Sequence, residues 1–184
     1  MAAPIVPAQP SPVNLRYLDF NTGGYARKLV SDNRGDMWVV GVSNDVQKFD
    51  DNFNPVAGTL EIIKLDSSGK ILFRTQFGSG SDAPYDATVN SQGDLYVVGT
   101  AGDGFPLVNP LPAEDRAGGF VMSVDANGNG IRFATTFAGA VAAIALDRSA
   151  NTYLTGWTSS SSFPVTPDAF QKIGIRTCVP SSSD

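Results

Sequence analysis

Apolar positions occur along this chain in short runs separated by polar turns. Three such runs, at residues 37–40, 95–98 and 120–124, hold mainly aliphatic, β-branched and aromatic side chains. Runs of about five residues with this composition are typical of half-buried β-strands. No segment places apolar residues at a sustained helical spacing. The pattern therefore predicts an all-β fold.

The polar segments between these runs share one motif, an Asp or Asn followed three residues later by Gly or Ala. An Asp or Asn side-chain oxygen can accept a hydrogen bond from the backbone two residues on, and Gly supplies the positive φ that a short hairpin loop needs. The motif therefore predicts β-hairpin turns. Its copies are Asp32 with Gly35, Asp66 with Gly69, Asn90 with Gly93, Asp125 with Gly128, and Asp147 with Ala150.

The chain also repeats itself at a fixed period. The glycines that close three matching segments, Gly41, Gly99 and Gly156, lie 58 and then 57 residues apart. Each period holds two hairpins, and therefore four antiparallel strands. The matching segments are residues 28–41, 86–99 and 143–156, and a second motif at residues 63–78 recurs at residues 122–139.

Four-stranded antiparallel units at a fixed period are the blades of a β-propeller, in which about 4 to 8 blades surround a central channel. A solenoid of parallel coils is the alternative, but it has shorter periods and no paired hairpin turns. The sequence thus predicts a partial β-propeller of four-stranded antiparallel blades. It has two complete blades, an extra outer strand and half of a third blade.

The alignment sets the predicted boundaries. Residues 1–13 are a proline-rich linker or mature N-terminus, and residues 14–184 form an incomplete propeller with blades at 25–78, 82–139 and 140–184, the last truncated. Because fewer than about 4 blades cannot close a ring, we expect self-association through open blade edges. The expected strands are 15–20 (outer strand), then 27–31, 37–41, 59–65 and 71–77, then 85–89, 95–99, 120–124 and 131–137, and finally 141–146 and 152–157.

The third copy of the repeat is similar to a known bacterial sequence. The segments concerned are Ala143-Ile-Ala-Leu-Asp147, Asn151-Thr-Tyr-Leu-Thr-Gly-Trp-Thr158 and Ser162-Phe-Pro-Val-Thr-Pro-Asp-Ala-Phe-Gln171. They resemble the β-propeller repeat called SBBP. The second copy keeps Gly104-Phe-Pro106 and Asn109-Pro110, whereas the first has no Phe-Pro pair. The resemblance, which spans residues 15–171, implies an extracytoplasmic bacterial protein, secreted or on the cell surface, that serves as a scaffold or binding module without assigned catalytic residues.

The amino-acid composition excludes several kinds of active site and partner. The chain has no histidine, which excludes imidazole general bases, Ser-His-Asp and Cys-His pairs, and His-ligated metals. Its net charge is −5 and its 13 Lys and Arg are scattered, so we expect no nucleic-acid partner. No apolar run approaches the ~18 residues that span a bilayer, and the first residues are not an intact signal peptide. Cys178 is the single cysteine and has no partner for an internal disulfide.

One turn resembles part of a calcium loop. Asp125, Asn127 and Asn129 stand at the alternate positions from which oxygen atoms wrap a hard cation. The bidentate carboxylate that should close the loop is replaced by Thr136, so we interpret the segment as a hairpin turn and expect no metal. The aligned Asp32, Asn90 and Asp147 could converge on a channel, but turn capping explains them more simply, because Asp66 and Asp125 recur in the other hairpin.

Aromatic residues recur at equivalent positions, and they have two interpretations. Exposed aromatics can stack on sugars, whereas large aromatics at equivalent positions of a repeat commonly fill the interface between blades. We expect blade packing for the whole set. Its members are Trp38, Tyr96, Tyr153, Trp157, Phe105 with Pro106, and Phe163 with Pro164.

Three functions agree with these patterns. The first is a non-catalytic scaffold or binding surface for a protein or glycan ligand, carried by the long loops at residues 42–58, 100–119 and from 158. The second is a propeller enzyme of the lactonase or lyase type, with a metal at the channel mouth held by a cluster of Asp82, Asp86 and Asp103. The third is a glycan-binding module. We expect the first, with no enzymatic activity and no cofactor.

Overall fold

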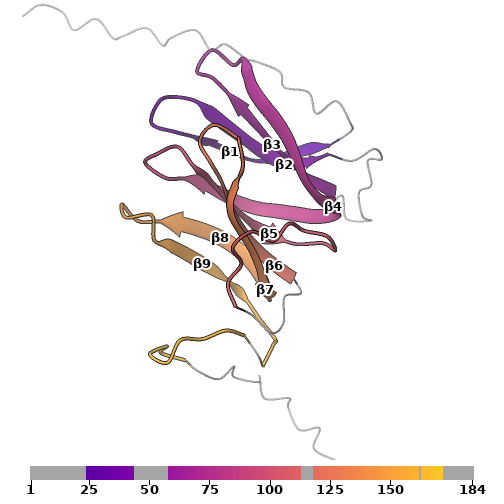
Figure 1. The fold of residues 1–184 in the computed structure, drawn as a ribbon, viewed down its shortest axis with the longest axis vertical. Coiled ribbons are helices and arrows are strands. Elements are labelled where there is room, and N and C mark those ends of the chain that lie inside the picture. Colours follow the sequence, from indigo (N-terminus) through magenta and orange to yellow (C-terminus); the bar gives the residue numbers. More distant parts are fainter. Residues whose placement is uncertain (1–23, 44–57, 113–117, 162, 172–184) are drawn as a thin grey trace, which may run out of the picture.

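The computed structural model describes residues 24–43, 58–112, 118–161 and 163–171. The predicted linker, the strand at residues 15–20, Cys178 and much of the first long loop lie outside these residues. Every regular element in the described part of the chain is a β-strand with antiparallel partners, which confirms the all-β prediction (Figure 1). Within that part, no helix is long and apolar enough to cross a membrane. The strands are β1 (Tyr25–Ser31), β2 (Met37–Ser43), β3 (Gly58–Leu65), β4 (Ile71–Val89), β5 (Leu95–Thr100), β6 (Gly118–Val124), β7 (Ile131–Ala138), β8 (Ala140–Leu146) and β9 (Thr152–Trp157).

The long strand β4 corrects one expectation. The sequence predicts separate strands at residues 71–77 and 85–89, but the structure joins them into one strand of 19 residues. Its first half pairs with β3 and its second half with β5. The connection stays extended because each half has its own ladder. Seven strands, β1 to β7, therefore follow one another in a single ladder that does not close, and β8 and β9 form a separate pair.

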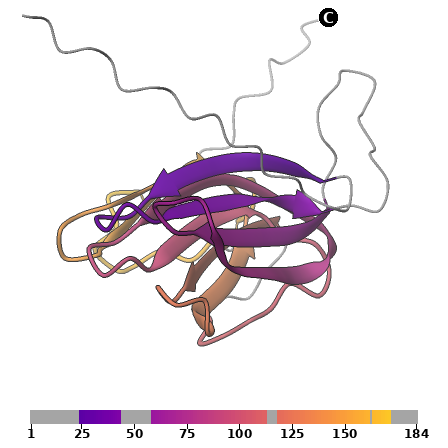
Figure 2. The same cartoon turned by 90° about the horizontal axis from the view of Figure 1, so that it is seen from above.

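The strands group into three units that follow the sequence repeat. The N-terminal unit comprises β1, β2, β3 and the first half of β4. The middle unit comprises the second half of β4 with β5, β6 and β7. The C-terminal unit is the pair β8 and β9. Figures 1 and 2 show the units as successive layers, from the indigo strands to the orange ones.

Each unit contains the same irregularity between its first two strands. The register skips one residue of the first strand, as a β-bulge does, at Arg27, Tyr85 and Ala142. On the second strand, a Cβ at the facing glycine would collide with a backbone carbonyl oxygen just before the bulge. The pairs are Gly41 with Tyr25, Gly99 with Ala83, and Gly156 with Ala140. The close approach of two backbones explains why the repeat keeps these glycines.

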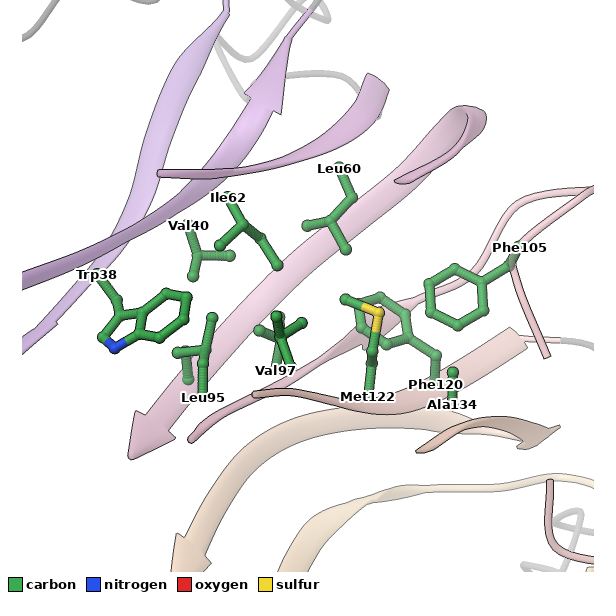
Figure 3. Close-up of a cluster of buried hydrophobic side chains, with 12 residues drawn as sticks. Trp38, Val40, Leu60, Ile62, Leu95, Val97, Phe105, Phe120, Met122 and Ala134 are labelled. Carbon is green, nitrogen blue, oxygen red and sulfur yellow. The ribbon is translucent and has the colours of Figure 1, made fainter. Parts of the chain in front are cut away.

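The main core lies between the N-terminal and middle units. Because side chains alternate along a strand, Trp38 and Val40 on β2 face the middle unit, whereas Val39 faces away. Leu95 and Val97 on β5 cover them from the other side (Figure 3). The cluster also includes residues of β3, β4, β6, β7 and the loop after β5. These residues are Leu60, Ile62, Ala87, Phe105, Phe120, Met122, Val124 and Ala134.

A second cluster joins the middle unit to β8. Tyr96, Val98 and Val121 lie on the opposite face of the middle unit and pack against Val141 and Ile144. The middle unit is therefore covered on both faces, as a sheet inside a stack must be. Burial of apolar side chains between units therefore stabilises the stack of described strands.

Candidate functional site

The hairpin turns that the sequence motif marks share one hydrogen-bond geometry. The Oδ1 atom of Asp66 accepts from the backbone N–H groups of Ser68 at 2.8 Å and Lys70 at 3.0 Å. Asp32, Asn90, Asp125 and Asp147 accept in the same way from the second and fourth residues after them. The fourth turn residue has a positive φ in each case: 81° at Gly35, 82° at Gly69, 87° at Gly93, 74° at Gly128 and 61° at Ala150.

In the turn that resembles a calcium loop, one candidate ligand atom accepts hydrogen bonds from the turn itself. Asp125 Oδ1 accepts from the backbone N–H of Asn127 at 2.8 Å and of Asn129 at 3.2 Å. The carbonyl oxygen of Ala126 accepts a hydrogen bond from the Lys64 ammonium at 2.8 Å. A cationic side chain therefore already lies against this turn. Across the described residues, no three Asp, Glu or Cys side chains are grouped to hold a metal ion.

A buried lysine that the sequence analysis missed joins the first two units. The Lys64 side chain is 2% exposed, and its ammonium lies 3.4 Å from a carboxylate oxygen of both Asp32 and Asp36. It also lies 4.9 Å from the centre of the Trp38 ring. Because the carboxylates belong to the N-terminal unit and Ala126 to the middle unit, Lys64 connects the two. The sequence does contain a signal for this buried charge, namely a lysine placed between aliphatic residues of a predicted strand.

Arg34 completes this ion network. Its guanidinium lies 3.3 Å from Asp32 and 3.9 Å from Asp36, so two cations face two carboxylates. Burial by itself would raise the pKa of Asp32, but hydrogen bonds from the backbone N–H groups of Arg34 and Asp36 and the charge of Lys64 hold it below its usual value. The network is therefore charge-balanced and structural in character.

A cavity of about 300 Å³ opens beside the ion network. The charged groups that line it are those of the network itself, which already pair with one another. The cavity has room for small polar molecules or water, and a charged ligand would have to compete with these ion pairs. Its lining residues are Arg34, Asp36, Lys64, Leu72, Phe73, Ala126 and Asn127.

Asp86 links the first strands of the three units. One carboxylate oxygen lies 2.7 Å from Lys28 Nζ on β1, and the other accepts the backbone N–H of Ile144 on β8 at 3.1 Å. Burial by itself would raise the pKa of Asp86, but the hydrogen bonds from Lys28 and Ile144 lower it below the usual value. Lys28 and Asp86 occupy equivalent positions of the repeat. The sequence alignment shows this equivalence, but it does not show that the two side chains touch.

The other two carboxylates of the enzyme hypothesis have different surroundings. Asp82 is fully buried and accepts the backbone N–H of Gly102 at 3.0 Å. Asp103 lies in the exposed loop after β5. Within the described residues, Asp82, Asp86 and Asp103 do not form a group that could hold a metal ion.

The recurring aromatic residues have contrasting environments. Trp38 is fully buried against the middle unit, and Tyr96 is 8% exposed against β8. Tyr153 and Trp157, on β9, are 59% and 67% exposed. The difference arises because β9 has no further sheet over this face among the described residues.

The two Phe-Pro pairs differ in burial, and the Phe of each contacts a Phe ring on a strand of the middle unit. The Phe105 ring lies 4.5 Å from the Phe120 ring, and Phe163 contacts Phe137 edge-on at 6.0 Å. Pro106 is half-buried and Pro164 is exposed. The loop that carries Phe105 also borders a second cavity, of about 260 Å³, with glycine-rich walls. It is lined by Ala101, Gly102, Asp103, Gly104, Phe105, Leu107, Gly118 and Thr136.

The chain matches no model of a known protein family, and the search of curated proteins finds no relative.

Proposed function

We propose that this chain is a non-catalytic β-propeller repeat module that acts as an extracytoplasmic scaffold and presents its loops to a protein or glycan ligand. One observation carries the proposal. The same hairpin, bulge and glycine recur in three successive units, and the first strands of these units meet at Asp86. This arrangement agrees with blades whose first strands surround a central channel.

Three further features support a scaffold or binding role. The candidate catalytic carboxylates Asp82 and Asp86 have structural hydrogen-bond partners, and the sequence has no histidine. The cavity beside Phe105 is lined mainly by a long loop, and loops on rigid scaffolds commonly bind ligands. The resemblance to SBBP repeats supports a location outside the cytoplasm.

A crystal structure tests the architecture. If the units are blades, superposing the N-terminal unit on the middle unit, and the middle unit on β8 and β9, requires rotations about one common axis. For about 4 to 8 blades the two angles are similar and lie between about 45° and 90°. Rotation axes that diverge, or first strands that lie farthest from the axis, would contradict the propeller.

Activity and binding assays test the function. We expect no turnover of lactones, esters or glycosides with or without divalent metals, and metal-dependent turnover that Asp86→Asn abolishes would establish the enzyme alternative instead. If a glycan binds in the loop cavity, the Leu107→Ser variant should bind it less on a glycan array. The control variant Leu29→Ser, at an exposed site on β1, should bind the glycan as the parent does. Glycan binding that both variants retain would place the ligand elsewhere.

A further inference from the structure

The C-terminal unit exposes an uncharged face. Ala143 pairs with Thr155 and Ala145 pairs with Tyr153, so these side chains share one face of the β8–β9 pair, together with Trp157. All five residues are exposed. The opposite face carries Ile144, which packs on the middle unit.

The equivalent faces of the other two units are both covered by a β-sheet. Trp38 and Val40 are buried under the middle unit, and Tyr96 and Val98 are buried under β8. Tyr153 stands at the position of Trp38 and Tyr96 in the repeat. The exposed face of β8 and β9 is therefore of the kind that this chain packs against another sheet.

This third face differs from the other two in charge. At the position of Ala143, the N-terminal unit has Lys28 and the middle unit has Asp86, and these two residues form the ion pair between the units. Alanine cannot continue that polar link. An isologous interface places the same patch on both partners, so charged residues near the symmetry axis would face their own copies. A neutral face avoids this repulsion.

Among the described residues, the opposite end of the stack offers a more polar surface, although Leu29, which pairs with Val39, is an exposed apolar side chain there. On the far face of the N-terminal unit, Val39, Ile63 and Leu65 are already buried. The same face carries an ion pair in which Arg74 Nε lies 2.6 Å from a carboxylate oxygen of Glu61. Head-to-tail association of two copies would bring the neutral aromatic face against this polar surface, which costs desolvation.

We propose that two copies of this chain associate through the β8–β9 face, stacked sheet on sheet about a two-fold axis, with Tyr153 and Trp157 of each copy packed against the other. This proposal goes beyond the scaffold function and does not depend on it. The face consists of only two short strands, so the dimer is weaker than one with the ~800 Å² per partner of a standard interface.

Two measurements on the full chain test the proposal. Sedimentation velocity should show mass rising from monomer towards dimer between about 1 μM and about 1 mM, the range expected for a small interface. Iodide quenching reports the same event, because Trp38 is fully buried and only Trp157, of the two tryptophans, is open to the quencher. The quenchable fluorescence should fall as the dimer forms.

Substitutions locate the interface. Tyr153→Thr combined with Trp157→Thr should weaken the dimer about tenfold or more, since both side chains are exposed and strand propensity is kept. The matched control is Leu29→Thr, at a strand position with the same 59% exposure as Tyr153, and it should leave association unchanged.

Each opposite result overturns the proposal. A chain that stays monomeric at about 1 mM has no such interface, and equal association of the parent and the double variant would place the contact elsewhere. Weakening by Leu29→Thr would show that the N-terminal unit takes part. Protection of Trp157 by cello- or chito-oligosaccharides in dilute, monomeric protein would make the face a glycan platform instead.

Discussion

At the scale of single residues, the charge of Lys64 is important to stability, because its ammonium is buried between two units. Lys64→Met keeps the length of the side chain but leaves Asp32, whose side chain is fully buried, without its buried partner. Removing one member of a buried ion pair costs about 3 to 5 kcal/mol. Urea unfolding should show a loss of this size.

The matched control for this substitution is Lys70→Met, at an exposed position in the hairpin that follows the same strand. We expect a change within about 0.5 kcal/mol there. Small and equal losses in the two variants would mean that the charge of Lys64 contributes little to stability.

Asp86 makes stability depend on pH. Its pKa in the folded state is lowered, so its contribution is present above the unfolded-state pKa of about 4 and is lost as the pH falls through the lower folded-state value. Asp86→Asn should therefore destabilise the protein at pH 7, and the difference from the parent should shrink near pH 2. Urea melts at the two pH values measure it, with Asp103→Asn as a control in the exposed loop. A difference that is the same at both pH values contradicts the assignment.

At the scale of elements, the bulge between the first two strands defines each unit. Gly99→Ala places a Cβ against the carbonyl oxygen of Ala83, which is backbone and cannot rotate away. Shifts of this kind cost about 1 to 3 kcal/mol. Thermal or urea unfolding of the variant should show the loss.

Gly130→Ala is the matched control for the bulge, because a Cβ at Gly130 meets its nearest atom at 3.9 Å. This second replacement should be close to neutral. If both variants unfold like the parent, the two backbones of the bulge do not approach as closely as the structure describes.

For the whole molecule, the shared core predicts that the first two units unfold together. Leu95 belongs to the middle unit but packs in the same cluster as Trp38 of the N-terminal unit. Leu95→Ala should cost about 2 to 5 kcal/mol. Trp38 fluorescence, isolated in a Trp157→Phe background, and far-UV circular dichroism should follow the same transition. Two separate transitions would show that the units are independent.

Local chemistry explains why so much of the fold could be predicted. The hairpins form within five residues, through one side-chain oxygen and one residue with positive φ, and both signals are visible in the motif at Asp66 and Gly69. The strands follow from alternation and β-branched content. The described strands accordingly lie where the pattern places them, with one exception. The sequence predicts two strands where β4 is continuous, because nothing local in the sequence shows that the residues between the two ladders stay extended.

The candidate site was harder to predict because its contacts join residues far apart in the chain. Lys64 reaches Ala126 across 62 positions, and Asp86 reaches Ile144 across 58. The alignment shows that Lys28 and Asp86 are equivalent, but equivalence alone does not state that they touch. Their 2.7 Å contact depends on how two units stack.

The sequence by itself determined the all-β class, the turns and the repeat period, since these depend on interactions between near neighbours and on the alternation of side chains. Only the tertiary structure decided which face of each unit is covered. Trp38 and Tyr153 occupy equivalent positions, yet one is fully buried and the other is 59% exposed. Burial is a property of what lies opposite, and the residues opposite come from another unit, beyond the reach of any local pattern.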